Sequence, residues 1–157
     1  MSEAHEGGGG VDRKAKSAAL DRVLELAVLV NEDMNRTLPQ DGLTPSRAHL
    51  LWELLHRGPS TQRVLADALR VSARTITGLI DGLAATGFVT REPHPADRRA
   101  TLVTFTQHGQ AVADKMRKDQ HLFADILFDG MPRERFDGLV EGLDDVLDRL
   151  RKAMAQQ

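Results

Sequence analysis

Cysteine is absent from this chain of 157 residues. Its absence excludes a disulfide framework, a zinc site with thiolate ligands and a catalytic thiol. Aromatic residues are scarce, with 5 Phe, 1 Trp and no Tyr, which is too few for a surface on which single-stranded nucleic acid stacks. No apolar run approaches the roughly 18 residues of a membrane-spanning helix. The N-terminus has no apolar signal core either, so we expect a cytoplasmic protein without membrane partners.

The charge is nearly balanced overall but unevenly distributed along the chain. Lys and Arg number 21 against 23 Asp and Glu, a net charge of −2. Between residues 45 and 110, however, all eight basic residues are arginines and only five residues are acidic. Arginine presents a planar group of donors that suits phosphates and guanine edges. A positive middle between negative ends therefore points toward nucleic acid as a partner.

Apolar residues at helical spacing predict long helices near both ends of the chain. The first spans residues 13–38 and ends at a Pro-Gly turn. Another begins after Thr106, is broken around Pro132 and is followed by a last helix. A run of four glycines predicts that residues 1–12 form a flexible tail.

Three shorter helices are predicted between the long ones. Thr44 precedes a proline and opens the first, because threonine suits an N-cap and proline suits the first helical position. Ser60 or Thr61 caps the second, and Ser72 caps the third, which covers residues 72–86.

The last two of these helices have helix-turn-helix spacing. Ala66 is small where they cross, and Val71 and Ile76 fill the angle between them. Arg70 stands at the turn where glycine is usual, and a left-handed residue there costs about 1 kcal/mol, so we expect a looser turn. The outward residues are small or hydrogen-bonding, as major-groove recognition requires, and the N-terminal N–H groups favour phosphates. These candidate DNA-binding residues are Ser72, Ala73, Arg74, Thr75, Thr77 and Gly78. The alternative is a helical corner that binds no nucleic acid.

A charged turn at residues 93–99 is the second candidate DNA-binding feature. An extended tip that carries Arg98 and Arg99 suits the minor groove, whose negative potential attracts arginine. Asp97, two residues before Arg99, is placed to orient that guanidinium through a bidentate pair. The alternative is an ordinary charged surface turn.

The fold class that follows is mainly α with a small β-hairpin wing. Strands over residues 88–92 and 101–105 form the wing. We expect a winged helix-turn-helix at residues 41–106, flanked by a helical dimerisation region at residues 13–40 and 107–157.

The long helices carry more apolar residues than the small centre can cover. A second copy of the chain is the simplest partner for them, so the sequence predicts a homodimer. The candidate interface residues are Leu20, Val23, Leu24, Leu139, Leu143, Val146 and Leu150.

The chain resembles the MarR family of transcriptional regulators over about residues 13–155. The likeness is most specific in the wing, where the family pattern is Asp-x-Arg, five residues, then Leu-Thr-x-x-Gly. This sequence follows the pattern from Asp97 to Gly109, with Phe105 in place of leucine. The resemblance implies a homodimer, most often a repressor, that reads a palindromic operator and is often released by a small aromatic or anionic effector.

An effector site is implied on the second helix. His49, Trp52 and His56 follow one another at i, i+3 and i+7 and share a helix face. The family's effector pocket lies between this helix and the dimerisation helices, so the three side chains are candidates to line it. The alternative is a packed tryptophan with exposed histidines beside it.

No catalytic residues, cofactor or metal site are predicted. The chain has no phosphate loop, no nucleophile elbow and no paired carboxylates in an apolar setting. The sequence thus favours a regulator of transcription over an enzyme. The alternative function is a winged-helix module that binds proteins and not DNA.

Overall fold

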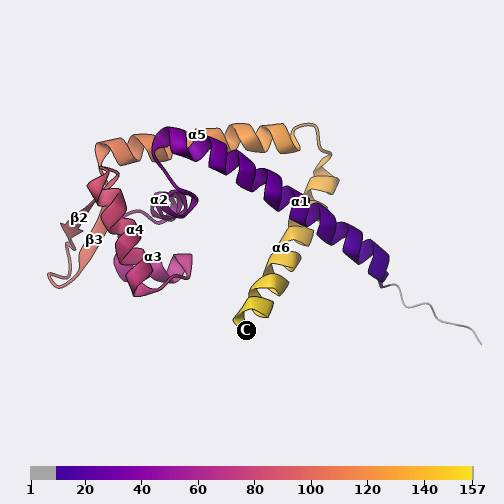
Figure 1. Cartoon of the computed structure of the whole chain (residues 1–157), viewed down its shortest axis with the longest axis horizontal. Coiled ribbons are helices and arrows are strands. Elements are labelled where there is room, and N and C mark those ends of the chain that lie inside the picture. Colours follow the sequence, from indigo (N-terminus) through magenta and orange to yellow (C-terminus); the bar gives the residue numbers. More distant parts are fainter. Residues whose placement is uncertain (1–9, 157) are drawn as a thin grey trace, which may run out of the picture. The chain divides into compact units, whose positions relative to one another are not determined.

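The computed structural model describes residues 10–156 (Figure 1). Of the predicted flexible tail, residues 1–9 lie outside this range, and Asp12 caps the first helix by accepting the backbone N–H of Ala15 at 2.7 Å. Two compact units make up the chain, Met1–Gln110 and Ala111–Gln157. None of the helices in the described range is long and apolar enough to cross a membrane.

The first unit contains the predicted order of helices and strands. A 25-residue helix comes first and a short 3-10 helix follows it, with Gly42 in the left-handed conformation at its end. Three shorter helices and a hairpin then follow, as the sequence predicts. The elements are α1 (Arg13–Thr37), η1 (Leu38–Asp41), α2 (Pro45–Arg57), β1 (Ser60–Thr61), α3 (Gln62–Leu69), α4 (Ala73–Ala85), β2 (Val89–Pro93) and β3 (Thr101–Phe105).

Side-chain caps begin the three short helices at the predicted residues. Thr44 accepts the N–H of Arg47, and Ser72 begins α4 in the same way. Of the two candidates for α3, Thr61 is the cap, whereas the Ser60 hydroxyl donates to the carbonyl of Gly58 at 2.9 Å. These caps satisfy helix N–H groups that have no partner within the helix.

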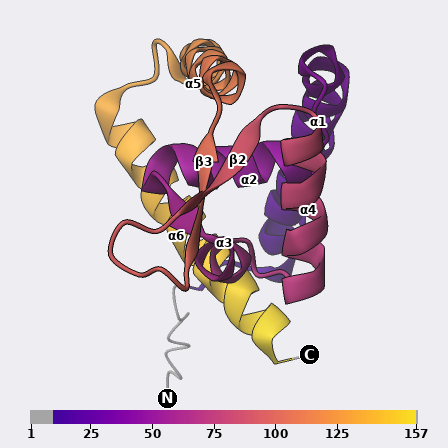
Figure 2. The same cartoon turned by 90° about the vertical axis from the view of Figure 1, so that its left-hand side faces the viewer.

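The sheet has three antiparallel strands in the order β1-β3-β2. Val89 pairs with Phe105 at one end of the hairpin, and Pro93 pairs with Thr101 at the other. Ser60, in the two-residue strand β1, pairs with Val103. The sequence predicts only the hairpin, because two residues are too few to show a strand pattern. Figure 2 shows the two longer strands and the loop that joins them.

The core lies where α2, α3 and α4 meet the sheet. Its largest side chains are almost completely buried, and each contributes about 1.5–3 kcal/mol by leaving water. They are Leu50, Leu51 and Leu54 from α2, Leu65 from α3, Ile76, Ile80 and Leu83 from α4, and Val103 from β3. This core fixes α4 and the hairpin relative to each other.

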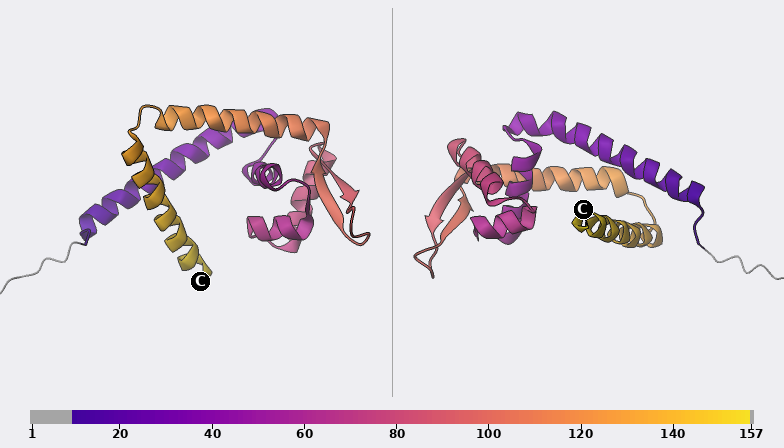
Figure 3. Two further views of the ribbon diagram at one scale, coloured as in Figure 1. Left: turned by 180° about the vertical axis from the view of Figure 1, so that it is seen from behind. Right: turned by 60° about the horizontal axis from the view of Figure 1, so that its bottom comes forward.

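The second unit consists of two helices, the main part of α5 (Gln107–Phe128) and α6 (Arg133–Ala155). Gly130, with φ +78°, lies in the turn between them, and the rings of Phe128 and Phe136 meet edge to face across it at 5.5 Å. Figure 3 shows these helices from two further sides. The described part of α6 has no buried residue.

Hydrogen bonds of Thr106 connect the start of α5 to the residues between α4 and the hairpin. The Thr106 hydroxyl donates to the carbonyl of Gly87 at 2.5 Å and accepts the N–H of Gly109 at 3.0 Å. The Thr106 N–H donates to the carbonyl of Phe88 at 3.1 Å. A Cβ atom at position 109 would lie only 1.8 Å from the Phe88 carbonyl oxygen. The close approach therefore requires glycine at this position.

We expect Gly109→Ala to lower the free energy of unfolding by about 3 kcal/mol, because the methyl group must displace backbone atoms. Gly78→Ala is the matched control, since nothing lies within 4 Å of a Cβ there. Alanine in a helix should raise the free energy of unfolding by up to about 1 kcal/mol. Urea denaturation measures both. Equal stability of the Gly109 variant and the native chain would contradict the close approach.

Candidate nucleic-acid interface

A tight turn joins α3 to α4. Arg70 is the one residue other than glycine with a positive φ among residues 10–156, at φ 54° and ψ 45°. Its N–H donates to the carbonyl of Asp67 at 3.2 Å, and the N–H of Val71 donates to the carbonyl of Ala66 at 3.1 Å. The expectation of a looser turn is therefore wrong. Arg70 adopts the left-handed conformation that glycine usually supplies, and packing of Leu65 and Ile76 in the core outweighs the cost.

The outward face of α4 exposes most of the candidate residues. Ala73, Arg74, Thr75 and Gly78 are exposed, and within the described range the Arg74 guanidinium forms no hydrogen bond or ion pair. Ser72 is also exposed, and its hydroxyl accepts the N–H of Thr75 at 3.1 Å. One of the N–H groups expected to be free for phosphate is thus occupied by the cap.

Thr77 is the exception on this face. It is half-buried, and its hydroxyl donates to the carbonyl of Ala73 at 2.8 Å. The same oxygen accepts a hydrogen bond from the side-chain amide of Gln62, at the start of α3. Because a hydroxyl has one hydrogen to donate, Thr77 has none left for a base. The side chain links α3 to α4.

The loop at residues 94–100 forms the tip of the wing and extends away from α3 and α4 (Figures 1 and 3). Arg98 and Arg99 are exposed, and their guanidinium groups form no hydrogen bond or ion pair in the described part of the chain. Asp97 contacts Arg99 in a way that the sequence did not predict. Its carboxylate accepts the backbone N–H of Arg99 at 3.0 Å, in place of the expected bidentate pair with the guanidinium. Asp97 therefore fixes the backbone from which the Arg99 side chain extends.

An ion pair that sequence patterns did not reveal connects α4 to the wing. Arg91 of β2 donates to the carboxylate of Asp81 of α4 at 2.6 Å. Both side chains are partly exposed, so the pair adds at most about 1 kcal/mol to stability. No local signal identifies it, because the two residues lie on different elements whose pairing depends on the tertiary fold. Its effect is on the orientation of the wing relative to α4.

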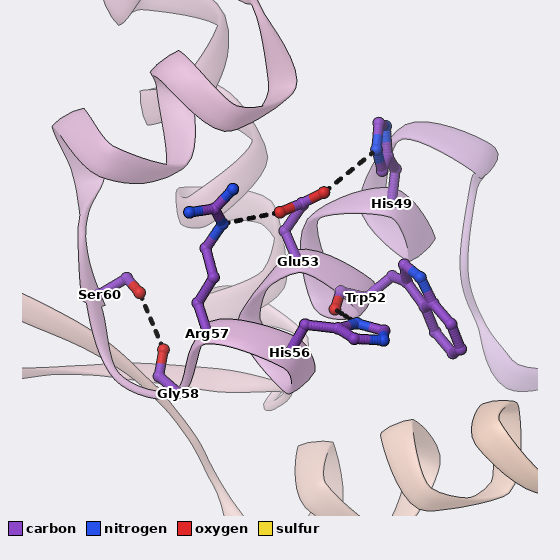
Figure 4. A network of polar contacts seen from close by, with 7 residues as sticks. All are labelled: His49, Trp52, Glu53, His56, Arg57, Gly58 and Ser60. Atoms are coloured by element: carbon purple, nitrogen blue, oxygen red, sulfur yellow. Dashed lines mark hydrogen bonds and ion pairs between the residues drawn. The ribbon is translucent and has the colours of Figure 1, made fainter. Parts of the chain in front are cut away.

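The candidate effector residues are only partly brought together on α2. The rings of Trp52 and His56 meet edge to face with centroids 4.6 Å apart, and the Nδ1–H of His56 donates to the Trp52 carbonyl at 2.8 Å. His49 is exposed and lies 3.9 Å from the carboxylate of Glu53, which also pairs with Arg57 (Figure 4). Trp52 is half-buried, so it is not a core residue. Among residues 10–156 no three His, Asp or Glu side chains are grouped to hold a metal ion.

Comparisons with known proteins assign the family. A model described as the MarR family matches residues 41–100, which contain the three short helices, β2 and the loop at the tip of the wing. The uncharacterised HTH-type transcriptional regulator ML2140 of Mycobacterium leprae is 35% identical over 102 residues, which are 64% of this chain and 71% of that protein. The chain belongs to the MarR family. It is a DNA-binding transcriptional regulator with a winged helix-turn-helix, and it is not an enzyme.

Two further similarities extend over more of this MarR-family chain. The HTH-type transcriptional repressor YetL of Bacillus subtilis is 29% identical over 132 residues, which cover 82% of this chain and 78% of that protein. The crystal structure of Streptococcus pneumoniae FabT in complex with DNA has a TM-score of 0.75 at 18% identity, covering 90% of this chain and 99% of that chain. At that identity the second similarity establishes the fold.

The turn conformation leads to a stability prediction. We expect Arg70→Gly to raise the free energy of unfolding by about 0.5 kcal/mol, because relief of the left-handed backbone exceeds the entropy that glycine adds to the unfolded chain. Arg63→Gly, in the first turn of α3, is the control and should lower it by about 0.5 kcal/mol. Thermal and urea denaturation measure both changes. A loss of stability in both variants would show that the turn is not left-handed.

Proposed function

We propose that this regulator is a homodimeric repressor that reads a palindromic operator through helix 72–86 and the wing at residues 93–99. The observation that carries the proposal is the position of three unpaired arginines, Arg74 on α4 and Arg98 and Arg99 on the wing tip. Cations without a protein partner, placed both on α4 and on the wing tip, are suited to bind a polyanion such as the phosphate backbone of DNA. These exposed, unpaired guanidinium groups favour DNA over the alternative of a protein-binding module.

In the proposed complex, α4 enters the major groove with its N-terminal half. Arg74 is the one long side chain on the exposed face, and it is suited to the O6 and N7 atoms of guanine. The small residues around it let the helix backbone approach the base edges closely. The hydroxyls of Ser72 and Thr75 lie 3.0 Å apart and hydrogen-bond to each other, so one of the two keeps a hydrogen for a phosphate. The proposed major-groove residues are Ser72, Ala73, Arg74, Thr75 and Gly78. Thr77 contributes indirectly, because its hydrogen bond with Gln62 holds α4 against α3.

The wing is proposed to enter the minor groove. Arg99 supplies the inserted cation, Arg98 contacts the phosphate backbone, and Asp97 orients Arg99 through the backbone N–H that it accepts. A narrow minor groove concentrates negative potential, and arginine is the side chain most often placed there.

Exposed apolar side chains on α1 and α6 support the proposed dimer. The seven proposed interface residues, named below, each leave between 37% and 56% of their surface exposed in the single chain. Such stripes on two helices exceed what a monomer in water usually exposes. A second copy would cover them, so we assign residues 13–40 and 107–157 to dimerisation and residues 41–106 to DNA binding. The proposed interface residues are Leu20, Val23, Leu24, Leu139, Leu143, Val146 and Leu150.

Release by a small aromatic or anionic effector is a further part of the proposal. The edge-to-face pair of the half-buried Trp52 and the exposed His56 supplies an aromatic surface, and the exposed His49 supplies a group that pairs with an anion when protonated. We place the protein in the cytoplasm, because a regulator of transcription acts where the chromosome is.

Selection of bound sequences from random duplex DNA tests the core of the proposal. We expect an enriched operator with two inverted half-sites about one helical turn apart, because a two-fold symmetric dimer presents two α4 helices. Sedimentation should give a stable dimer at micromolar concentration, with an interface of about 2,000 Å² or more. A stable monomer, or selected DNA without inverted symmetry, would contradict the homodimer.

The selected operator also serves to test the effector site. An aromatic carboxylate should quench the fluorescence of Trp52, the sole tryptophan, and weaken operator binding. By linkage, the operator should weaken effector binding by the same factor. If a broad panel of aromatic acids leaves fluorescence and operator binding unchanged, Trp52 and His56 only pack against each other.

The roles of Arg99 and Asp97 are separable by substitution. We expect Arg99→Ala to lower operator affinity about tenfold to a hundredfold, the effect of losing a charged contact, and to reduce the salt dependence by about one unit. Asp97→Ala should also weaken binding, although it removes a negative charge near DNA, because the Arg99 backbone loses its hydrogen bond. Asp97→Asn keeps an acceptor oxygen and should bind at least as tightly as the native chain.

Fluorescence anisotropy at several salt concentrations measures these affinities, and dimer formation should be unchanged in all three variants. Unchanged affinity of the Arg99→Ala variant would exclude the proposed minor-groove contact. Tighter binding by the Asp97→Ala variant would exclude the orienting role of Asp97.

A further inference from the structure

One ring nitrogen holds the turn at the tip of the wing. Nδ1 of His94 accepts the backbone N–H of Ala96 at 3.0 Å and that of Asp97 at 3.2 Å. His94 is half-buried and lies at the base of the loop, where its backbone N–H donates to the carbonyl of Ala100 at 3.0 Å. These bonds determine the course of the chain immediately before Arg98 and Arg99.

The two hydrogen bonds to Nδ1 require an uncharged imidazole. A ring nitrogen accepts a hydrogen bond only when it carries no proton, so the ring's single hydrogen is on Nε2. A protonated ring has N–H groups at both nitrogens. Its Nδ1–H would point at the N–H groups of Ala96 and Asp97, and donors facing donors repel. Histidine is the side chain that ordinarily changes charge between roughly pH 5 and pH 8.

We propose that His94 is a positioning residue for DNA binding, which holds the wing arginines in place while its ring is uncharged and releases them when the ring is protonated. The inference rests on the proposed function, in which the wing contacts DNA. In this inference His94 itself contacts no DNA. Protonation of its ring loosens the wing, so operator affinity falls as the pH falls.

The charged groups around His94 do not account for such a pH dependence by themselves. Arg91 of β2 is already paired with Asp81 of α4, and neither β1 nor β3 carries a charged residue. No ion pair joins His94 to a carboxylate within residues 10–156. The remaining charged neighbours in the hairpin are Glu92, Asp97, Arg98 and Arg99.

The DNA itself acts in the opposite direction. A protonated histidine near phosphates adds a favourable charge, so simple electrostatics predicts tighter binding at low pH. If protonation of His94 breaks the hydrogen bonds that hold the turn, operator binding should instead weaken at low pH. The sign of the pH dependence therefore distinguishes a positioning role from a histidine that only adds charge.

The experiment measures operator affinity at about pH 7.5 and about pH 5.5, at constant ionic strength, for the native chain and two variants. His94→Asn keeps an acceptor oxygen at the same place and does not titrate. His94→Ala has no acceptor. We expect the native chain to lose about tenfold more affinity than the His94→Asn variant when the pH falls, which corresponds to the loss of two hydrogen bonds. The His94→Ala variant should bind about tenfold more weakly than the native chain at the higher pH, and the His94→Asn variant should bind within about threefold of it.

A second measurement uses the free protein. The backbone amide resonances of Ala96 and Asp97 should shift during a pH titration of the native chain and stay fixed in the His94→Asn variant. The same pH dependence of operator affinity in the native chain and the His94→Asn variant would overturn the proposal, as would tighter binding of the native chain at low pH.

The Arg99→Ala variant separates this inference from the proposed function. If that variant binds the operator as tightly as the native chain, the wing does not contact DNA and the proposed function fails at that point. If it binds weakly while the His94→Ala variant binds normally at both pH values, the wing contacts DNA and only the role of His94 is wrong.

Discussion

The hydroxyl group of Thr106 connects three parts of the first unit. It donates to the carbonyl of Gly87, where α4 has just ended, and accepts the N–H of Gly109 in the first turn of α5. Because the Phe88 carbonyl leaves no space for a side chain at position 109, these segments approach as closely as backbones can. The Thr-x-x-Gly part of the MarR-family pattern thus has a steric cause. It holds the hairpin, which carries the wing, at a fixed distance from α4.

Short-range contacts also shape the surface that we propose to bind DNA. Asp81 and Arg91 connect the exposed side of α4 to β2, and Thr77 connects α4 to the start of α3. At the wing tip, the side chains of His94 and Asp97 accept backbone N–H groups of the loop. None of these contacts is buried deeply, so each adds little to the stability of folding. Together they hold in place the backbone segments from which the exposed arginine side chains extend.

Local sequence patterns were sufficient to predict the α-helices, the two hairpin strands and the helix-turn-helix. Caps at Thr44 and Ser72 and the apolar periodicity of α1 each depend on residues that are close in sequence. Two local expectations were wrong: Arg70 is left-handed, and Asp97 accepts a backbone N–H and not the guanidinium of Arg99. Local propensity gives the free-energy cost of a left-handed arginine, but whether the chain adopts that conformation depends on how much packing of the core stabilises it. Features that join distant segments, such as β1 with β3, left no local pattern to detect.

The exposed face of α4 has few atoms with which to distinguish bases. With the Thr77 hydroxyl occupied by the carbonyl of Ala73, Arg74 is the only long polar side chain in the first two turns. In the proposed homodimer, a helix of this composition would distinguish few bases in each half-site of the operator. A regulator built on it would depend on the spacing between two half-sites and on the deformability of the intervening DNA to distinguish its operator from the many similar sequences of a genome.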